Sequence, residues 1–399
     1  MANSNLTSAK NAKNDEFYTQ YYDIEKEITA YIEFNSDMFR GKTVLLPCDD
    51  PEWSNFTKLF AQNFERFGLK KLISTSYAPD SKNYKNGYMP SLFETSNPQF
   101  DEKKTVKNGK IFTLTHDKTG DGKIDVNDLD WNYLDGDGDF KSNEIKKLRD
   151  EADFIITNPP FSLFRDFLAW VMEADKQFVI IGNMNAITYK EVFPLIKNNK
   201  MWLGNGFHAG NAYFSTPFAK EYAEGVYNPE TGLVKFRNVC WFTNIDHGRR
   251  HQPLPLMTLE DNLKYSKHKE IKGKEAYVKY DNYDAIEVPF TNAIPSDYKG
   301  IMGVPISFLD KYCPEQFEIL GITKTWFGLA TKIYPDQIQV SKTGIKTVVS
   351  KLNDGATINM DSSEVNGTHY IVNNNCYIQV YARVLVRHKN TNTADQTNK

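Results

Sequence analysis

The chain has 399 residues, which is long enough for two domains of ordinary size. Hydrophobic residues make up 40% of it, but no apolar run approaches the roughly 20 residues that a transmembrane helix requires, so we expect no membrane span. The net charge of −3 disfavours a protein that coats nucleic acid without regard to sequence, and it leaves room for local basic surfaces.

The first part of the chain predicts alternating helices and strands. Ser54 is a natural N-cap for an amphipathic helix, and Gly68 is the glycine expected to end it. The predicted elements are a helix that ends near residue 32, a buried strand over 43–48, a helix over 55–67 and a second strand over 71–75. A strand, a helix and a strand at this spacing form a βαβ unit, so we expect parallel strands.

The pattern is then interrupted. Residues 78–150 are rich in Asp, Asn, Lys and Gly and have no long helical period, so we interpret them as an acidic insertion. Within the run 153–157, the apolar residues 154–156 predict a buried parallel strand, and Ser162 is the expected N-cap of an amphipathic helix that follows it. The next predicted elements are a strand over 178–183, a helix over 189–197 and an antiparallel strand over 235–244.

The sequence changes character after Asp246. Residues 247–253 form a basic linker that ends in proline. The chain beyond it contains short β-like runs, such as 300–306 and 377–386, which are separated by Gly and Pro residues. This pattern predicts a second domain of mixed, β-rich structure over 247–390, followed by a disordered tail over 391–399.

Asn158, Pro159, Pro160 and Phe161 follow the strand at its carboxyl end, where ligands bind in open α/β sheets. The Asn158 amide both donates and accepts hydrogen bonds, and the two prolines fix the direction of the carbonyls beside them. Phe161 adds a flat stacking surface. The tetrapeptide therefore predicts a pocket for a planar base that carries an amino group, and the alternative is a simple turn after a strand.

The strand, the Asn-Pro-Pro-Phe loop and the helix together resemble the catalytic motif of S-adenosylmethionine-dependent amino-group methyltransferases, and most closely that of the N6-adenine DNA methyltransferases. The resemblance implies that the Asn158 side-chain oxygen and the Pro159 carbonyl accept hydrogen bonds from the target amine, while Phe161 stacks on the base. It also implies S-adenosyl-L-methionine as the cofactor and a base that leaves the duplex before it is methylated.

The resemblance includes an expected cofactor site. Residues 17–19 resemble the N-terminal cofactor-binding motif of members that carry their recognition region last, and residues 44–56 stand where the first cofactor loop belongs. The cofactor-binding residues implied in this way are Phe17, Tyr18, Thr19, Pro47, Asp49, Asp50, Glu52 and Asn158. The usual glycines of this loop are absent here, and so is the usual acid of the second strand, where residues 74–76 are Ser-Thr-Ser. The alternative for the three carboxylates is a solvated loop.

In both departures the chain resembles one subfamily, the EcoRI-type modification methylases. The segments that resemble this subfamily are 14–26, 45–56, 135–164, 181–204, 237–247 and 301–321. The resemblance implies methylation of adenine N6 in a short double-stranded DNA site, alongside a restriction endonuclease that need not bind the chain.

Two other features indicate different chemistry. Residues 117–128 follow the spacing of a twelve-residue calcium loop, with glycine at the sixth position but Asp128 in place of the usual glutamate at the twelfth. A second acidic run at 135–140 lacks the glycine, and the alternative for both is a turn cluster held by Asx-type hydrogen bonds. The cysteines, Cys48, Cys240, Cys313 and Cys376, form no Cys-x-x-Cys pair, so we expect reduced thiols and no metal site.

We therefore expect an α/β fold in which a Rossmann-like S-adenosylmethionine-dependent methyltransferase domain over 1–246, with the insertion at about 78–150, precedes a β-rich DNA-recognition domain over 247–390. Arg249 and Arg250 are the expected DNA contacts, because basic side chains beside a catalytic cleft steer a duplex towards it. The N-terminus has no signal pattern, and we expect a cytoplasmic monomer. The alternatives are an RNA or protein-glutamine N-methyltransferase and a calcium-binding interaction protein.

Overall fold

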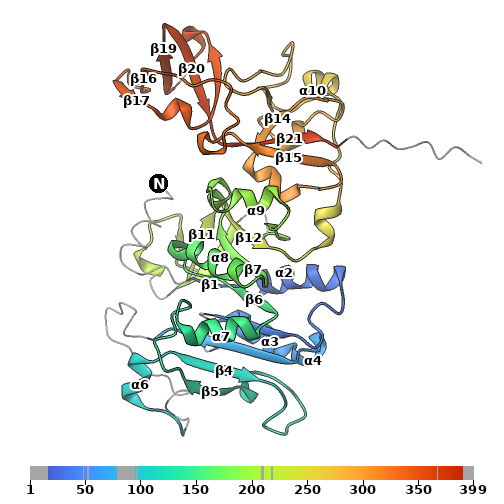
Figure 1. The fold of residues 1–399 in the computed structure, drawn as a ribbon, viewed down its shortest axis with the longest axis vertical. Helices are drawn as coiled ribbons and strands as arrows, with labels where there is room; N and C mark the ends of the chain where they lie inside the picture. The colour runs from blue at the N-terminus through green and yellow to red at the C-terminus, as the bar shows by residue number, and fades with distance from the viewer. Residues whose placement is uncertain are drawn as a thin grey trace, which may run out of the picture. The chain divides into compact units, whose positions relative to one another are not determined.

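The computed structural model describes residues 17–47, 49–51, 54–78, 95, 98–207, 211–216, 219–365 and 367–389. Contacts between residues divide the chain into two compact units (Figure 1). The first unit comprises Met1–Met184 and Met201–Gly248, and the second comprises Asn185–Lys200 and Arg249–Lys399. Within the described residues, no helix is long and apolar enough to cross a membrane.

The first unit is built on an eight-stranded mixed sheet with the order β5-β4-β3-β2-β6-β7-β12-β8. The central strands β3, β2, β6 and β7 are parallel, and the strands on either side of them are antiparallel. Their bounds are β2 Thr43–Leu46, β3 Lys71–Ser76, β4 Lys110–Leu114, β5 Asp130–Tyr133, β6 Phe154–Thr157, β7 Gln177–Asn183, β8 Trp202–Leu203 and β12 Val239–Thr243. Every residue of β2 and β6 is buried, as their uninterrupted apolar sequences predict.

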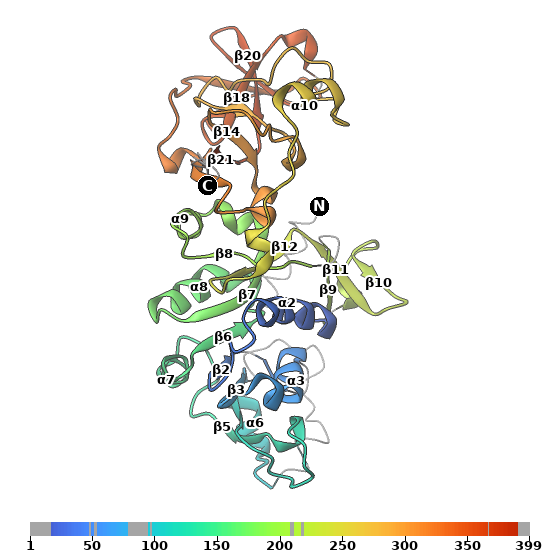
Figure 2. The ribbon, with the colours of Figure 1, turned by 90° about the vertical axis from the view of Figure 1, so that its right-hand side faces the viewer.

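Helices cover both faces of this sheet. α7 (Asn143–Glu151) and α8 (Phe164–Glu173) lie on one face, and α2 (Tyr21–Phe34) and α3 (Asn55–Gln62) lie on the other (Figure 2). This coverage explains why the central strands are apolar on both sides, because neither face meets water.

The predicted helix over 55–67 has the predicted ends but is interrupted. Ser54 caps α3, since its hydroxyl oxygen accepts the Phe56 N–H at 3.1 Å. Asn63 separates α3 from the short α4 (Phe64–Phe67), and Gly68 ends α4 with φ of 64°.

The region 78–150, interpreted as an insertion, contributes strands to the sheet. β4 pairs antiparallel with β3, and β5 pairs with β4. Phe112, Leu114 and Trp131 are buried although the segment around them is acidic, and their alternation with more exposed residues marks the two strands. The region also contains α6 (Glu102–Lys107) and α7, the helix that precedes β6.

The predicted strand over 235–244 is two strands in different sheets. Asn238 adopts φ of 60°, which ends β11 (Leu233–Arg237) and redirects the chain into β12. β11 belongs to a separate four-stranded sheet with the order β1-β9-β11-β10. The other strands of this small sheet are β1 Tyr18–Thr19, β9 Asn211–Ser215 and β10 Tyr227–Asn228. The antiparallel pairing of β12 with β7 confirms the predicted direction.

The second unit contains two antiparallel-rich sheets. Their orders are β13-β14-β21-β15 and β17-β16-β19-β20-β18. Their bounds are β13 Ile286–Glu287, β14 Met302–Pro305, β15 Phe317–Ile322, β16 Gln337–Val340, β17 Lys346–Val349, β18 Ala356–Met360, β19 His369–Val372, β20 Asn375–Val380 and β21 Arg383–His388. The predicted strand over 377–386 is thus divided between β20 and β21. The helices of this unit are α9 (Phe193–Lys197), shorter than the helix predicted over 189–197, and α10 (Leu259–Tyr265).

Candidate functional site

The carboxyl ends of β2 and β6 lie side by side and bring two predicted segments together. Leu45 of β2 is opposite Ile155 of β6 in the parallel pairing. Since parallel strands end at the same edge of a sheet, the loop that begins at Pro47 and the segment that begins at Asn158 emerge next to each other. The Thr157 hydroxyl is 2.7 Å from the Pro47 carbonyl oxygen, which joins the two exits directly.

The Asn158 side chain is held so that its oxygen remains available. Its Nδ2 donates to the Phe17 carbonyl oxygen at 2.6 Å, and this acceptor fixes which way the amide faces. Its Oδ1 is buried and has no hydrogen-bond partner. A buried acceptor without a partner costs roughly 1–3 kcal/mol, so the geometry favours a ligand that donates a hydrogen bond to it.

Phe161 lies in an aromatic cluster at the same edge. Its ring is stacked on Phe17 with centroids 5.6 Å apart, and it meets the edges of Phe214 at 6.2 Å and Phe236 at 6.4 Å. Phe161 itself remains half-buried. Phe214 and Phe236 belong to the small sheet, and the sequence analysis did not include them in the site. The only local signal for them is the alternation of buried aromatic residues within two short β-like runs.

The helix after the tetrapeptide begins later than predicted. Residues 161–163 form a 3₁₀ turn, and α8 begins at Phe164 with Leu163 at its N-cap position. The predicted N-cap role of Ser162 is therefore wrong. The prolines cause this difference, because they hold the chain extended at Pro160 and the tight turn must complete the change of direction first.

Asp49 is the centre of a buried hydrogen-bond network. Its carboxylate accepts the Ser54 hydroxyl at 2.7 Å and lies 2.5 Å from the Thr157 hydroxyl. Its carbonyl oxygen accepts hydroxyl hydrogen bonds from Thr57, at 2.9 Å, and from Ser74. Ser74, which stands in the second-strand region where an acid is usual, therefore supports the loop after β2.

The environment of Asp49 changes its acidity. Burial raises the pKa of the Asp49 carboxyl from 3.8 to about 7, against the opposing effect of the hydroxyl hydrogen bonds from Thr157 and Ser54. The side chain is 6% exposed, and both carboxylate oxygens are used inside the unit. A contact between this carboxylate and a cofactor would have to be made in addition to those bonds, and the predicted cofactor role of Asp49 stays a prediction.

The N-terminal segment predicted to bind a cofactor lies beside these groups. Tyr18 and Thr19 form β1 and pair with Ser215 and Phe214 of β9. The Thr19 carbonyl oxygen accepts from Asn55 Nδ2 at 2.8 Å, while its hydroxyl oxygen is buried without a partner. The site thus has a second buried oxygen with no partner.

The remaining residues of the predicted cofactor loop are only partly described. Asp50 is half-buried, and its carbonyl oxygen accepts the Ser54 N–H at 2.7 Å. Glu52 lies outside the described residues. The predictions for both carboxylates remain untested by contacts.

Glu27 is a further buried carboxylate that the sequence analysis did not identify. One oxygen accepts the Asn205 N–H at 2.9 Å and the other accepts the Gly206 N–H at 3.0 Å, while the Tyr31 hydroxyl donates at 2.5 Å. Burial raises the pKa of Tyr31 well above its usual value, and the neighbouring Glu27 raises it further. Glu27 therefore fixes the loop after β8 to helix α2. The helical position of Glu27 gave no signal, because an acid on a helix is usually exposed.

The two arginines predicted to contact DNA both have partners within the second unit. Arg249 forms an ion pair with Asp310 at 2.5 Å, and both side chains are about one-third exposed. Arg250 is buried and donates to the Asn199 side-chain oxygen. DNA binding by either guanidinium would require these interactions to be exchanged or extended, and the DNA role of both residues stays a prediction.

The acidic loop 117–128 is held by hydrogen bonds to its own backbone. Asp117 accepts the N–H groups of Gly120 and Gly122, and Asp128 accepts those of Lys118 and Thr119. No group of three His, Cys, Asp or Glu side chains placed to hold a metal ion occurs among the described residues. The carboxylates therefore act here as Asx-type turn acceptors. Cys240 lies buried in β12 and forms no disulfide.

Comparisons with known proteins agree over most of the chain. Residues 5–389 match the family model described as adenine-specific methyltransferase EcoRI. The chain is 43% identical to the type II methyltransferase M.EcoRI of Escherichia coli, over 81% of this chain and 90% of that protein. It is 33% identical to the type II methyltransferase M.MpnI of Mycoplasma pneumoniae, over 78% of this chain and 83% of that protein. No solved structure matches the chain significantly.

Proposed function

Because this chain belongs to the family of adenine-specific EcoRI methyltransferases, we propose that it transfers a methyl group from S-adenosylmethionine to the N6 amino group of adenine within a specific short site in double-stranded DNA. The observation that carries the catalytic assignment is the buried, unpartnered Oδ1 of Asn158 at the end of β6. By analogy with the type II relatives, the modification protects DNA from a restriction endonuclease that acts on the same site.

Asn158 and the prolines position the target amine. The lone pair of the adenine N6 is delocalised into the ring, so the amine is a poor nucleophile until hydrogen-bond acceptors hold it. The Asn158 Oδ1 and the Pro159 carbonyl are the proposed acceptors, and both offer negative partial charge where positive charge develops on nitrogen during attack. Positioning and electrostatic stabilisation then supply the catalysis without a covalent intermediate. Pro160 keeps the segment rigid.

Phe161 is proposed to stack on the target base. The base must leave the duplex to reach Asn158, and an aromatic face stabilises an unstacked base by roughly 1–3 kcal/mol. The stacked Phe17 and the edge contacts with Phe214 and Phe236 hold the Phe161 ring in one orientation. This support makes the ring a rigid surface rather than a mobile side chain.

The residues beside the tetrapeptide fit S-adenosylmethionine. The buried oxygens of Thr19 and Asn158 lack partners, which suits a ligand rich in amino and hydroxyl donors. The other proposed cofactor contacts come from the loop after β2 and from the N-terminal segment beside it. They are Phe17, Tyr18, Pro47, Asp49 and Asp50, and Glu52 is proposed with them on the sequence argument. When bound, the cofactor supplies an electrophilic methyl group on its sulfonium. The sheet with helices on both faces agrees with a Rossmann-like catalytic domain.

The second unit is proposed to recognise DNA. It contains the whole chain after residue 248, including the β-rich part predicted to read the site. Arg249 and Arg250 remain candidate contacts on the sequence argument.

The test is methyl transfer from cofactor labelled in its methyl group, with duplex DNA, RNA and protein offered separately. We expect label in DNA adenine alone, and the same rate with and without a calcium chelator. Asn158→Ala should abolish transfer while cofactor affinity stays within about tenfold, because the lost oxygen faces the target amine. Asn132→Ala, which removes an exposed amide in β5, is the matched control. Near-normal turnover by Asn158→Ala would refute the catalytic assignment.

A further inference from the structure

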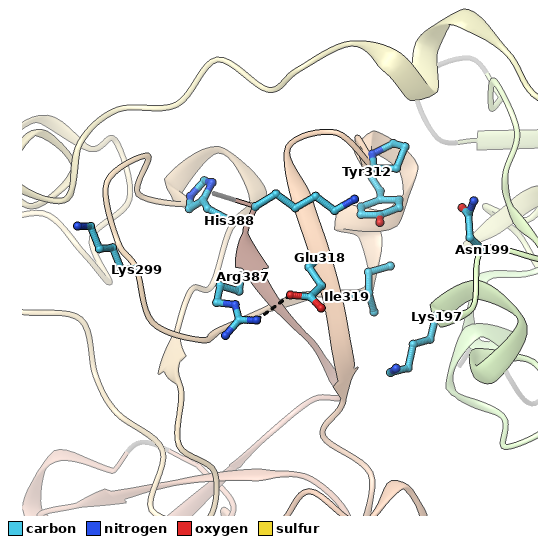
Figure 3. Close-up of a pocket in the computed structure, with 10 residues that line it drawn as sticks. Lys197, Asn199, Lys299, Tyr312, Glu318, Ile319, Arg387 and His388 are labelled. Carbon is cyan, nitrogen blue, oxygen red and sulfur yellow. Dashed lines mark hydrogen bonds and ion pairs between the residues drawn. The ribbon is translucent and has the colours of Figure 1, made fainter. Parts of the chain in front are cut away.

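The second unit contains a pocket of about 870 Å³ with a predominantly basic lining (Figure 3). The lining residues are Lys197, Asn199, Lys299, Tyr312, Pro314, Glu318, Ile319, Arg387, His388 and Lys389. They come from the segment 185–200 and from the chain after residue 249, so the whole pocket belongs to one unit. We refer to it as the basic pocket.

The charges of the basic pocket are unbalanced. Glu318 is its one carboxylate among the lining residues, and Arg387 pairs with that group at 2.8 Å. Lys197, Lys299 and Lys389 are exposed, and within the described part of the chain no carboxylate lies in ion-pair distance of their ammonium groups. Three uncompensated lysines in one concavity are notable in a chain whose net charge is −3. A concave surface of one sign concentrates its field and attracts ligands of the opposite charge.

The fold holds these lysines around a rigid floor. β15 and β21 pair antiparallel, with Glu318 opposite Arg387 and Phe317 opposite His388. His388 is fixed in turn, because its Nε2 lies 2.8 Å from the Pro295 carbonyl oxygen and its ring packs on Phe317. Figure 3 places Lys197 on one side of the Arg387–Glu318 pair and Lys299 on the other. Lys197 and Lys299 therefore lie on either side of an ion pair that is carried by two paired strands.

A buried cation reinforces the wall of the pocket. Arg250 is 7% exposed and donates to the side-chain oxygen of Asn199, a lining residue. Burial raises the pKa of Tyr312, another lining residue, to about 12, while the nearby charge of Arg250 opposes that rise. The guanidinium thus bonds to one lining residue and lies near a second one.

The lining chemistry suits phosphate groups rather than bases. Five of the ten lining residues, Lys197, Lys299, Arg387, His388 and Lys389, carry a basic group, while Tyr312, Pro314 and Ile319 supply the apolar part of the lining. Flexible ammonium groups contact phosphate oxygens as point charges and carry no base-edge pattern. The pocket volume of about 870 Å³ is also large for one isolated phosphate.

We propose that the basic pocket binds backbone phosphates of the DNA duplex through Lys197, Lys299 and Lys389, independently of the base sequence. The inference rests on the proposed function for its ligand, because a DNA methyltransferase must hold a duplex. It adds phosphate contacts in the pocket to the candidate contacts of Arg249 and Arg250, and Arg250 also supports the pocket wall through its hydrogen bond to Asn199.

The test measures binding of the full chain to a cognate and a scrambled duplex over a range of salt concentrations. Each neutralised phosphate contact contributes about 0.9 to the slope of log affinity against log salt. We expect Lys197→Ala, Lys299→Ala and Lys389→Ala each to lower the slope by about that amount and to weaken both duplexes equally. The triple variant should lower it by roughly 2.7, and Lys→Arg variants should restore it.

Lys70→Ala is the matched control, because it removes an exposed lysine that precedes β3 in the first unit. An unchanged slope in all three single variants and the triple variant would overturn the proposal. A loss confined to the cognate duplex would also overturn it, since that result indicates base contacts. Failure of the proposed function is distinguishable, because it would appear as absent methyl transfer by the unmodified chain at saturating DNA.

Discussion

Asp49→Asn offers a sharp test of the network at the carboxyl ends of β2 and β6. The Thr157 hydroxyl lies within hydrogen-bond distance of two acceptors, the Pro47 carbonyl at 2.7 Å and the Asp49 carboxylate at 2.5 Å, but it has only one proton to donate. If Asp49 is neutral, its own O–H donates to Thr157 and frees the Thr157 proton for Pro47. Asparagine reproduces this neutral arrangement, because its amide N–H₂ replaces the acid O–H as donor.

The magnitude follows from the raised pKa. The Asp49 carboxyl has a pKa of about 7 in the folded chain against 3.8 for the unperturbed group, so the folded state binds its proton more tightly. Stability from this group is therefore fully present below pH 3.8 and is lost as the pH rises towards and through 7. Between pH 5 and pH 8 this loss amounts to roughly 3 kcal/mol of the free energy of unfolding.

The assay is urea denaturation of both proteins at a series of pH values. Other titrating groups are common to the two chains, so the difference between them isolates Asp49. We expect Asp49→Asn to gain roughly 3 kcal/mol relative to the unmodified chain as the pH increases from 5 to 8. Asp37→Asn, which alters an exposed acid paired with Arg40, is the control and should show little change. A difference that stays constant with pH for Asp49→Asn would refute the reasoning.

Three further predictions test other parts of the site. Phe161→Ala should reduce the population of the extrahelical base, measured as 2-aminopurine fluorescence at the target position, because stacking is worth roughly 1–3 kcal/mol; an unchanged signal would remove this ring from the base pocket. Glu27→Gln should lower the free energy of unfolding by about 1–3 kcal/mol in urea, since the new N–H₂ faces a backbone N–H, whereas exposed Glu33→Gln should have little effect. Arg250→Ala should cost about 1–3 kcal/mol of stability through its buried hydrogen bond, and Arg249→Ala less than about 1 kcal/mol. If Arg249→Ala also lowers the slope of log affinity for DNA against log salt concentration, that result would support the predicted contact between Arg249 and DNA.

Local patterns were sufficient where one segment decides its own structure. The apolar runs of β2 and β6 predicted their burial, and the Ser54 cap and Gly68 were predicted from residue type alone. The segment containing Asn158 was located correctly at a strand end because two prolines cannot continue a sheet ladder. These features depend on the properties of individual residues or of one short segment, which do not change with the fold.

The failures share a different cause. The runs 235–244 and 377–386 each have the composition of one strand, yet each is divided between two sheets. At Asn238 a positive φ redirects the chain, and asparagine tolerates that conformation without being restricted to it, so its presence predicts nothing by itself. The division of the second run between β20 and β21 is likewise decided by pairing partners far away in the sequence.

The aromatic support of Phe161 could not be predicted for the same reason. Phe214 reaches the site because β1 pairs with β9, and Phe236 reaches it because β11 pairs with β9. Those pairings join the N-terminal segment to strands that follow β8, and no local period encodes them. The sequence therefore identified the groups proposed to act on the base but not the residues that hold them in place.

The loop after β2 explains how the site can form without the glycines that usually allow a cofactor to approach the backbone. Here the carboxyl and carbonyl oxygens of Asp49 form hydrogen bonds with four hydroxyl groups, those of Ser54, Thr57, Ser74 and Thr157. These hydroxyls belong to the N-terminal part of α3, to β3 and to β6, so one residue fixes the loop relative to three elements. Thr157 immediately precedes the tetrapeptide that is proposed to hold the adenine. We therefore expect a change in the charge of Asp49 to act on the proposed cofactor loop and on the proposed base pocket together.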